Sequence, residues 1–331
     1  MFIAIQQSFT QALSTPATRG LLIFVVTLML AAPLVFEVLS ISKKISRELR
    51  KEMYLRYASW LVLVPLLMLP ILAGRQFAIA SILLIALLCY REFARATGLF
   101  RKRALSVTVV LGILATFYAC ADHWYGFFVA LPSLCVALTV IVALFDKSPN
   151  GYIQRVGLAF ISILMFATCL GHYAYFANDA RFQGIMLLVL LCVEINDVFA
   201  FACGKALGKH KLCPTISPNK TTEGFVGAIL LTTTLFYFVG QHVFAGTPLD
   251  SPVHLIVMGA LLSSIGQVGD LVMSSIKRDL NLKDMGQSIP GHGGLLDRFD
   301  SLLFVGPVLF HYIGYVAGVG LDQPTRLFTG G

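Results

Sequence analysis

Two short stretches of the sequence hold most of the residues that could do chemistry, and the longer is SSIKRDLNLKDMGQSIPGHGGLLDRFDS, residues 274–301. Asp284, Asp297 and Asp300 offer the hard oxygen ligands that Mg²⁺ prefers. Asp297 and Asp300 are three residues apart, so they can share one helix face. Phosphates could pair with four cations in the stretch, which are Lys277, Arg278, Lys283 and Arg298. Close backbone approach to a ligand is favoured by glycines around His292, which include Gly293 and Gly294.

The second stretch is GKALGKHKLCPTISPNKTTEGF, residues 204–225. It is not a P-loop, because the glycine spacing differs and no Ser or Thr follows the lysine. It nevertheless supplies Lys220, a potential phosphate partner, and hydroxyl groups at Ser217 and Thr221. Thr221 can also cap a helix that begins near Gly224. Basic side chains beside a helix N-terminus suit a phosphate ligand.

Acidic residues also occur inside apolar segments that precede both stretches. The run LLCVEINDVFAFACG contains Glu194 and Asp197 on one predicted helix face. In ALLSSIGQVGDLVMSSIKR, a polar stripe at helical spacing consists of Ser263, Gln267, Asp270 and Ser274. A charge at the centre of a bilayer costs about 2.5–3.5 kcal/mol on insertion scales, so such residues face a bundle interior or a wet cavity. A purely structural polar network is the alternative interpretation.

The elements that must position these residues are membrane helices. The chain of 331 residues is 57% hydrophobic and only 13% charged, whereas about a quarter of the residues of a soluble domain are charged. The seven cysteines lie singly, without metal-binding spacing. We therefore expect an all-α, polytopic integral membrane protein with about ten transmembrane helices. The predicted spans are 20–40, 58–74, 76–90, 104–121, 126–145, 156–177, 184–204, 224–246, 253–274 and 302–320.

The distribution of Lys and Arg predicts the orientation. Alternate loops hold 21 of the 25 basic residues, and the other side holds only Arg19, Arg75, Arg181 and Arg326. The positive-inside rule then places the loops 205–223 and 275–301 in the cytoplasm, with both termini outside. We expect one membrane domain, in which residues 1–155 form the N-terminal helices and residues 156–331 carry the catalytic loops. The net charge of +8 lies in short loops, so no nucleic-acid partner is expected.

Carboxylates at the base of a membrane cavity, next to Lys, Arg and Gly, indicate metal-assisted phosphoryl or nucleotidyl transfer. The run S-x-I-K-R-x4-K-D-x-G-x2-I-P-G-H-G-G-L-x-D-R-F-D, Ser274 to Asp300, resembles the signature of phosphatidate cytidylyltransferases. The run from Asn196 to Phe225 is similar to that family as well. The resemblance implies transfer of a cytidylyl group from CTP to phosphatidate with Mg²⁺, in a homodimer in the inner (plasma) membrane of a bacterium. The number of metals is left open, including a second, monovalent cation.

The resemblance also assigns roles to residues. As metal ligands it implies Asp197, Asp270 and Asp297, followed by Asp284 and Asp300. As phosphate-binding cations it implies Lys220, Lys277, Arg278 and Arg298. As residues that line the site it implies Ser217, Thr221, Glu223 and His292. Lys283, Gly293 and Gly294 complete the predicted substrate-binding set.

Three positions depart from the pattern of the family and indicate a divergent branch. Asn196 stands where many members carry Ala, Glu194 adds an acid, and Phe201 stands where Tyr is common. These differences bear on the lipid acceptor more than on the chemistry. A related transferase that uses another lipid acceptor therefore remains an alternative. A transporter is another alternative, with Asp197 and Asp270 as an ion relay, although no inverted repeat is evident.

Overall fold

The computed structural model describes residues 2–41, 47–289, 293–318 and 326–330. Ten of the helical segments within these ranges are long and apolar enough to cross a membrane. This confirms the predicted all-α polytopic architecture, and each predicted span coincides with one segment. Because a bilayer offers no water to backbone amides, each span must satisfy its hydrogen bonds internally, which a helix does.

The spans have the following bounds. They are α2 Pro16–Ile41, α3 Arg47–Ala73, α4 Arg75–Ala96, α5 Arg103–Ala121, α6 Tyr125–Val142, the composite α7 Tyr152–Ser162 with η3 Ile163–Cys169 and α8 Leu170–Phe176, α9 Phe182–Leu207, α10 Thr222–Val243, α11 Pro252–Asp279 and α12 Leu296–Ala317. A short α1, Phe2–Ser14, precedes them. Three 3-10 turns, η1 Leu99–Arg101, η2 Ala143–Asp146 and η4 Pro248–Asp250, complete the helical elements.

Two features of the fold were not predicted from the sequence. One is α1, which precedes the first span. The other is a small antiparallel hairpin of β1 Lys211–Cys213 and β2 Ser217–Thr221, which joins α9 to α10. The predicted tight connection between the second and third spans is confirmed. Gly74, with a φ of 120°, separates α3 from α4 there, and only glycine adopts such a backbone conformation without strain.

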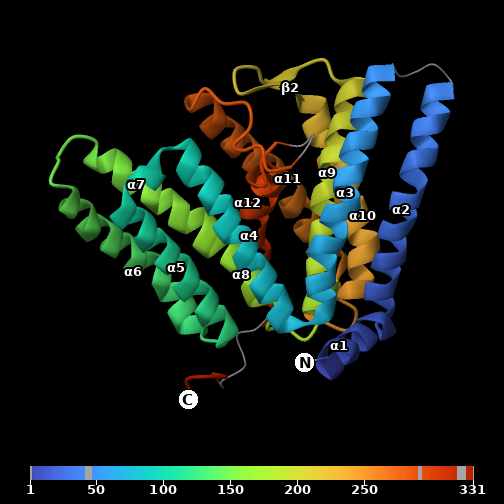
Figure 1. Cartoon of the computed structure of the whole chain (residues 1–331). Coiled ribbons are helices and arrows are strands. Elements are labelled where there is room, and N and C mark those ends of the chain that lie inside the picture. The colour runs from blue at the N-terminus through green and yellow to red at the C-terminus, as the bar shows by residue number, and fades with distance from the viewer. Residues whose placement is uncertain (1, 42–46, 290–292, 319–325, 331) are drawn as a thin grey trace.

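The helices form two groups that lean apart (Figure 1). The green helices α5 to α8 stand on one side, and α2, α3, α9 and α10 stand on the other. Between them, α11 packs against both α10 and α12, and α12 also contacts α8 and α4. The two loops singled out in the sequence leave the bundle at one end, opposite to both ends of the chain.

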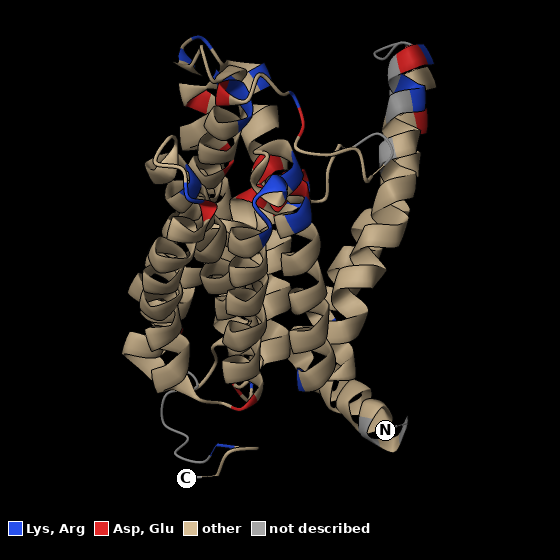
Figure 2. Ribbon diagram, turned by 60° about the vertical axis from the view of Figure 1, so that its left-hand side comes forward, with Lys and Arg blue, Asp and Glu red and all other residues tan. Residues whose placement is uncertain are grey.

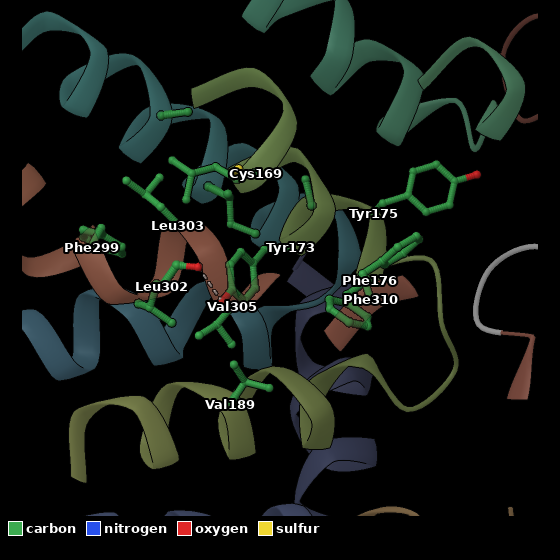
Figure 3. Close-up of a cluster of buried hydrophobic side chains, with 14 of the residues drawn as sticks. Cys169, Tyr173, Tyr175, Phe176, Val189, Phe299, Leu302, Leu303, Val305 and Phe310 are labelled. Atoms are coloured by element: carbon green, nitrogen blue, oxygen red, sulfur yellow. Dashed lines mark hydrogen bonds between the residues drawn. The ribbon is translucent and has the colours of Figure 1, made fainter. Parts of the chain in front are cut away.

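A cluster of buried side chains joins α8, α9 and α12 in the core of the bundle (Figure 3). Phe176 and Phe310 pack with their ring centroids 5.1 Å apart, at an interplanar angle of 70°. The buried Tyr173 hydroxyl donates a hydrogen bond to the Leu302 carbonyl oxygen at 2.9 Å. This contact fixes α8 against α12, whose first turns carry Asp297 and Asp300. The apolar core thus anchors one element of the candidate site.

Charged residues are unevenly distributed along the bundle (Figure 2). Lys, Arg, Asp and Glu gather at the end that carries the loops, and some lie deeper between the helices, whereas few lie near the chain termini. The apolar middle and the multiple spans establish a multi-pass membrane protein. Charged residues gather at the end opposite to the chain termini (Figure 2). The sequence predicts the same separation, because its basic loops alternate with loops on the side of the termini.

Candidate active site

Three acids from three different helices come together near the charged end. Asp197 of α9, Asp270 of α11 and Asp300 of α12 interact electrostatically with one another. Asp300 is only 8% exposed, whereas Asp197 is exposed and Asp270 is partly buried. Like charges that influence one another repel unless cations or a metal compensate them. This arrangement brings together three of the five predicted metal ligands.

The hairpin supplies a cation to this group of acids. Lys220, on β2, places its Nζ 2.6 Å from Oδ2 of Asp270. The same ammonium lies 3.4 Å from the carbonyl oxygen of Gln267, and the Ser274 hydroxyl donates to Oδ1 of Asp270 at 3.2 Å. The hairpin is thereby tied to α11, the helix that leads into residues 274–301.

Asp297 lies in the first turn of α12 and organises the loop before it. Its Oδ1 accepts a hydrogen bond from Lys277 Nζ at 2.9 Å. Its Oδ2 accepts hydrogen bonds from the backbone N–H groups of Met285 and Gly294, both at 2.9 Å. The Asp297 and Lys277 side chains are 2% and 11% exposed. Three donors thus already surround this carboxylate, and Lys277 interacts with Asp300 as well.

Arg298, on α12, has unused hydrogen-bonding capacity beside the acids. Its Nε is buried and has no hydrogen-bond partner among the residues that the structure describes. The guanidinium interacts electrostatically with Asp197 and Glu194. A buried polar nitrogen without a partner carries a desolvation cost of about 1–3 kcal/mol. An anionic ligand that accepts from this nitrogen would relieve that cost.

Known proteins resemble this chain over most of its length. Residues 54–316 match the profile of the cytidylyltransferase family. The chain belongs to the cytidylyltransferase family. It is 32% identical over 269 residues to the uncharacterized protein YnbB of Escherichia coli, covering 80% of this chain and 88% of YnbB.

Two further relatives have named activities. The chain is 35% identical over 222 residues to a phosphatidate cytidylyltransferase of Bacillus subtilis, covering 63% of this chain and 80% of that protein. It is 34% identical over 212 residues to a phosphatidate cytidylyltransferase of Staphylococcus aureus, covering 55% of this chain and 79% of that protein. Similarity both to these proteins and to an uncharacterized relative agrees with the predicted divergent branch.

The polar stripe of this cytidylyltransferase divides into two parts. Asp270 and Ser274 belong to the acidic group, but the deeper Ser263 contacts Asn196. The Asn196 Oδ1 accepts from the Ser263 hydroxyl at 2.5 Å and from the Thr232 hydroxyl at 2.9 Å. All three side chains are buried. The inner part of the stripe is therefore a structural polar network, in which the hydrogen bonds of Asn196 join α9 to α10 and α11.

Other predicted residues of the cytidylyltransferase lie around the hairpin. The Thr221 hydroxyl caps α10 by accepting from the Gly224 N–H at 3.1 Å, and Ser217 is partly buried on β2. Glu223 pairs with the exposed His210 at 2.6 Å. Arg278 donates to the carbonyl oxygens of Ile216 and Leu282 at 3.3 and 3.2 Å. In this structure these residues hold the hairpin and the loop in place.

The remaining predictions concern the loop before α12. Lys283 and Asp284 are both exposed. Gly293 has a φ of 80°, and a Cβ added there would lie 3.0 Å from the Asp284 carboxyl carbon. Gly294 is buried and donates to Asp297. His292 lies outside the described residues.

Sequence reasoning missed Glu92 of α4. This residue lies at the start of a segment that reads as a basic loop, REFARATGLFRKR. In the structure it is buried, and it accepts hydrogen bonds from Ser288, Leu295 and Leu296. The available signal was a lone acid at the apolar end of a span, two residues after Tyr90. Nothing local in the sequence indicates that its partners lie about 200 residues away.

The acids of the cytidylyltransferase are suited to hold a divalent cation. Within the described residues, no three His, Cys, Asp or Glu side chains form a ready-made metal cage. Mg²⁺ does not require one, because it usually binds one or two carboxylates together with water and substrate phosphates. The mutual interaction of Asp197, Asp270 and Asp300 supplies the concentrated negative charge that such an ion compensates. The donor set therefore fits Mg²⁺ delivered with a nucleotide.

Proposed function

We propose that this protein transfers a cytidylyl group from CTP to phosphatidate, which yields CDP-diacylglycerol and pyrophosphate. The observation that carries this proposal is the convergence of Asp197, Asp270 and Asp300 with Lys220 and Arg298 inside a membrane bundle. Family membership supports the nucleotide, and the named relatives support the acceptor.

The reaction balances without an additional base. A phosphate oxygen of phosphatidate, already anionic at neutral pH, forms a bond to the α-phosphorus of CTP. The bond between that phosphorus and the oxygen bridging to the β-phosphate breaks, and pyrophosphate departs with the electron pair. The protein then needs to align two anions and neutralise the charge on the leaving group, which is how phosphoryl-transfer enzymes obtain most of their catalysis.

Lys220 and Asp270 are proposed to exchange partners when the nucleotide binds. In the structure they form an ion pair of 2.6 Å. A triphosphate brought next to Lys220 offers it a denser negative charge, and Asp270 is then free to hold Mg²⁺. The side chains of Lys220 and Asp270 are only 20% and 25% exposed. An unpaired charge at either residue would therefore be poorly hydrated, which is costly. The pair thus keeps the charge of Asp270 compensated until substrate arrives.

Asp197, Asp270 and Asp300 are the residues that would hold Mg²⁺. When bound, this ion neutralises phosphate charge and stabilises the leaving pyrophosphate. Arg298, whose buried Nε has no partner among the described residues, would bind a phosphate of CTP or of phosphatidate. Lys277 has a second role, because it holds Asp297 and so keeps the loop folded.

An apolar groove beside the acids supports a lipid acceptor. It has a volume of about 440 Å³ and runs between α2, α3 and α9. Glu194 and Val198 line this groove. Asp197 lies between them in the sequence, three residues after Glu194 and one before Val198. A diacyl substrate could lie in such a groove with its phosphate near the acids. The proposed setting is the inner (plasma) membrane of a bacterium, with the site facing the cytoplasm and the protein acting as a homodimer.

The direct test is an assay of the purified protein in detergent with labelled CTP and phosphatidate, with and without Mg²⁺. The proposal expects Mg²⁺-dependent formation of labelled CDP-diacylglycerol and equimolar pyrophosphate. A panel of other lipid phosphates tests the alternative acceptor. If folded protein turns over another lipid phosphate but not phosphatidate, the proposed acceptor is wrong. If it consumes no CTP with any acceptor, the proposed chemistry is wrong.

A further inference from the structure

Glu92 reaches from α4 into the loop that leads to the candidate site. Its Oε1 accepts from the Ser288 hydroxyl at 2.5 Å and from the Leu295 N–H at 3.0 Å. Its Oε2 accepts from the Leu296 N–H at 2.9 Å. The residue is 9% exposed. A carboxylate so enclosed, with three donors, is a strong and directional contact, because hydrogen bonds to charged groups are stronger than neutral ones.

The loop backbone is closely fitted around this carboxylate. A Cβ added at Gly286 would lie 2.8 Å from Glu92 Cδ, and one added at Gly294 would lie 2.5 Å from Glu92 Oε2. Real side chains essentially never approach so closely, so both positions require glycine at this separation. Gly286 and Gly294 therefore leave room for a carboxylate that belongs to a distant helix.

Glu92 replaces the cap that α12 lacks. The N-cap position is occupied by Leu295, which makes no side-chain cap hydrogen bond, and leucine is a poor N-cap residue. The first amides of a helix need acceptors. Here Asp297 accepts from Gly294, and Glu92 accepts from Leu295 and Leu296. A negative charge at this end also interacts favourably with the helix dipole.

The start of α12 determines where the site residues lie. Arg298 and Asp300 follow Leu296 within about one helical turn, so a shift of the helix start displaces both side chains. Two carboxylates already occupy the amides of Gly294, Leu295 and Leu296, so these three amides are not available to phosphate. Contacts to substrate phosphates then depend on side chains such as Arg298, which makes their placement important.

We infer that Glu92 is a positioning residue of the transferase, which fixes the start of α12 and thereby places Arg298 and Asp300 for substrate. This inference rests on the proposed function. Lys220 approaches from the hairpin, and among the described contacts it has none with Glu92. Loss of Glu92 should therefore impair the alignment of Arg298 and Asp300 with the substrate more than it impairs nucleotide binding.

The test compares E92Q with E37Q in full-length protein. Glutamine keeps the size but offers one acceptor oxygen, so its NH₂ group faces an N–H donor. We expect kcat of E92Q to fall about 10–100-fold, with little change in the KM for CTP. Glu37, which pairs with Arg50 at 2.6 Å and with the Tyr54 hydroxyl, is the matched control, and E37Q should keep wild-type kinetics.

Hydrogen exchange measured by mass spectrometry separates positioning from general destabilisation. In E92Q, peptides that contain Leu295 and Leu296 should exchange faster, while peptides of α9 and α10 stay unchanged. Full activity in E92Q would overturn the inference, and so would faster exchange throughout the protein. The exchange result does not depend on the substrate, so failure of wild-type turnover with phosphatidate would refute the proposed function separately.

A second variant decides the matter if E92Q does not fold. S288A removes only the hydroxyl donor of Glu92 and leaves both backbone contacts. We expect about a fivefold loss of kcat, as for one hydrogen bond of ordinary strength, and faster exchange confined to the loop and the start of α12. Wild-type kinetics together with wild-type exchange in S288A would overturn the inference.

Discussion

The two ends of the bundle both carry polar side chains, but they use them differently. At the end near the chain termini, Asp122 accepts hydrogen bonds from the N–H groups of Phe328 and Thr329, at 2.5 and 3.2 Å, and from the Thr329 hydroxyl. Arg75 donates to Asn178 Oδ1 and to the Ala121 carbonyl oxygen, both at 2.7 Å. Asp122 and Arg75 are satisfied by these hydrogen bonds, and they also interact electrostatically with each other, so the cluster holds the fold and needs no ligand.

At the loop end, charges of the same sign are held together. Asp197, Asp270 and Asp300 interact with one another, and the Arg298 Nε has no partner within the described ranges. Such an arrangement costs stability, which proteins tolerate where a ligand later supplies the compensation. In this protein a fully satisfied polar cluster is structural, whereas a group of like charges beside an unpartnered guanidinium nitrogen indicates a binding site.

Neutralising one acid at each end tests whether the two clusters differ in function. D270N should lower kcat by roughly 10²–10³-fold, a loss typical of removing one key electrostatic contact. Its thermal stability should change little, because the lost pair with Lys220 is offset by relief of repulsion from Asp197 and Asp300. D122N, at the other end, is the control and should remain active. Cytidylyl transfer and thermal unfolding in detergent measure both, and an active D270N would contradict the contrast.

Asp297 should behave differently from its neighbour Asp270, because it is already satisfied. D297N removes a buried partner from Lys277 and weakens the contacts to Met285 and Gly294. We expect the free energy of unfolding to fall by about 3–5 kcal/mol, the usual cost of breaking a buried ion pair, and activity to fall with it.

The exposed Asp279, on the same side of the protein, provides the stability control for D297N. D279N should leave the free energy of unfolding unchanged, because a solvated carboxylate contributes little. Titration with a denaturing detergent compares the variants. Full stability in D297N would show that the carboxylate does not organise the loop.

Substitution of Arg298 tests whether its unpartnered Nε binds the substrate. R298K keeps the positive charge but loses the planar fork, including Nε. We expect kcat/KM to fall about tenfold or more, as for loss of a charge-assisted hydrogen bond. R278K should cost less, because Arg278 is exposed and donates to backbone carbonyl oxygens. Equal losses in the two variants would mean that Arg298 has no special contact.

The smallest effect is expected from pH at the end near the termini. Burial opposes ionisation of Asp122, but the hydrogen bonds from Thr329 and Phe328 outweigh it and lower the pKa. A lowered pKa means that the contact has full strength above pH about 4 and is lost as the pH falls through the folded-state pKa. Arg326 lies over the Trp124 ring at 4.8 Å, so Trp124 fluorescence in a W60F background reports release. A change that begins well above pH 4 would contradict this assignment.

The sequence predicted the membrane architecture well because the bilayer imposes simple rules. Each predicted span corresponds to a helix, and the break at Gly74 separates two of them as expected. The convergence of Asp197 and Asp270 agrees with the expectation that acids inside apolar spans face a bundle interior or a wet cavity. The β1–β2 hairpin could not be predicted in the same way, because its strands are short and polar and pair without a buried face.

Sequence spacing alone could not separate the polar residues that form structural contacts from those that belong to the candidate site. Ser263 and Asp270 belong to one stripe, yet Ser263 contacts Asn196 and Asp270 contacts Lys220. Helical spacing gives the direction of a side chain but not the residue that faces it. Asp297 and Asp300 likewise share a helix turn, and only their neighbours separate a loop-organising carboxylate from one that faces other acids.

By itself the sequence determined the multi-pass fold, the family and the group of residues from which the site is made. These follow from hydropathy and from local motifs, which need no knowledge of distant partners. Only the tertiary structure decided which acids share one environment, which are already neutralised, and that Glu92 of α4 caps α12. Such contacts join residues up to about 200 positions apart, and their energies depend on burial and distance, which arise only when the helices pack.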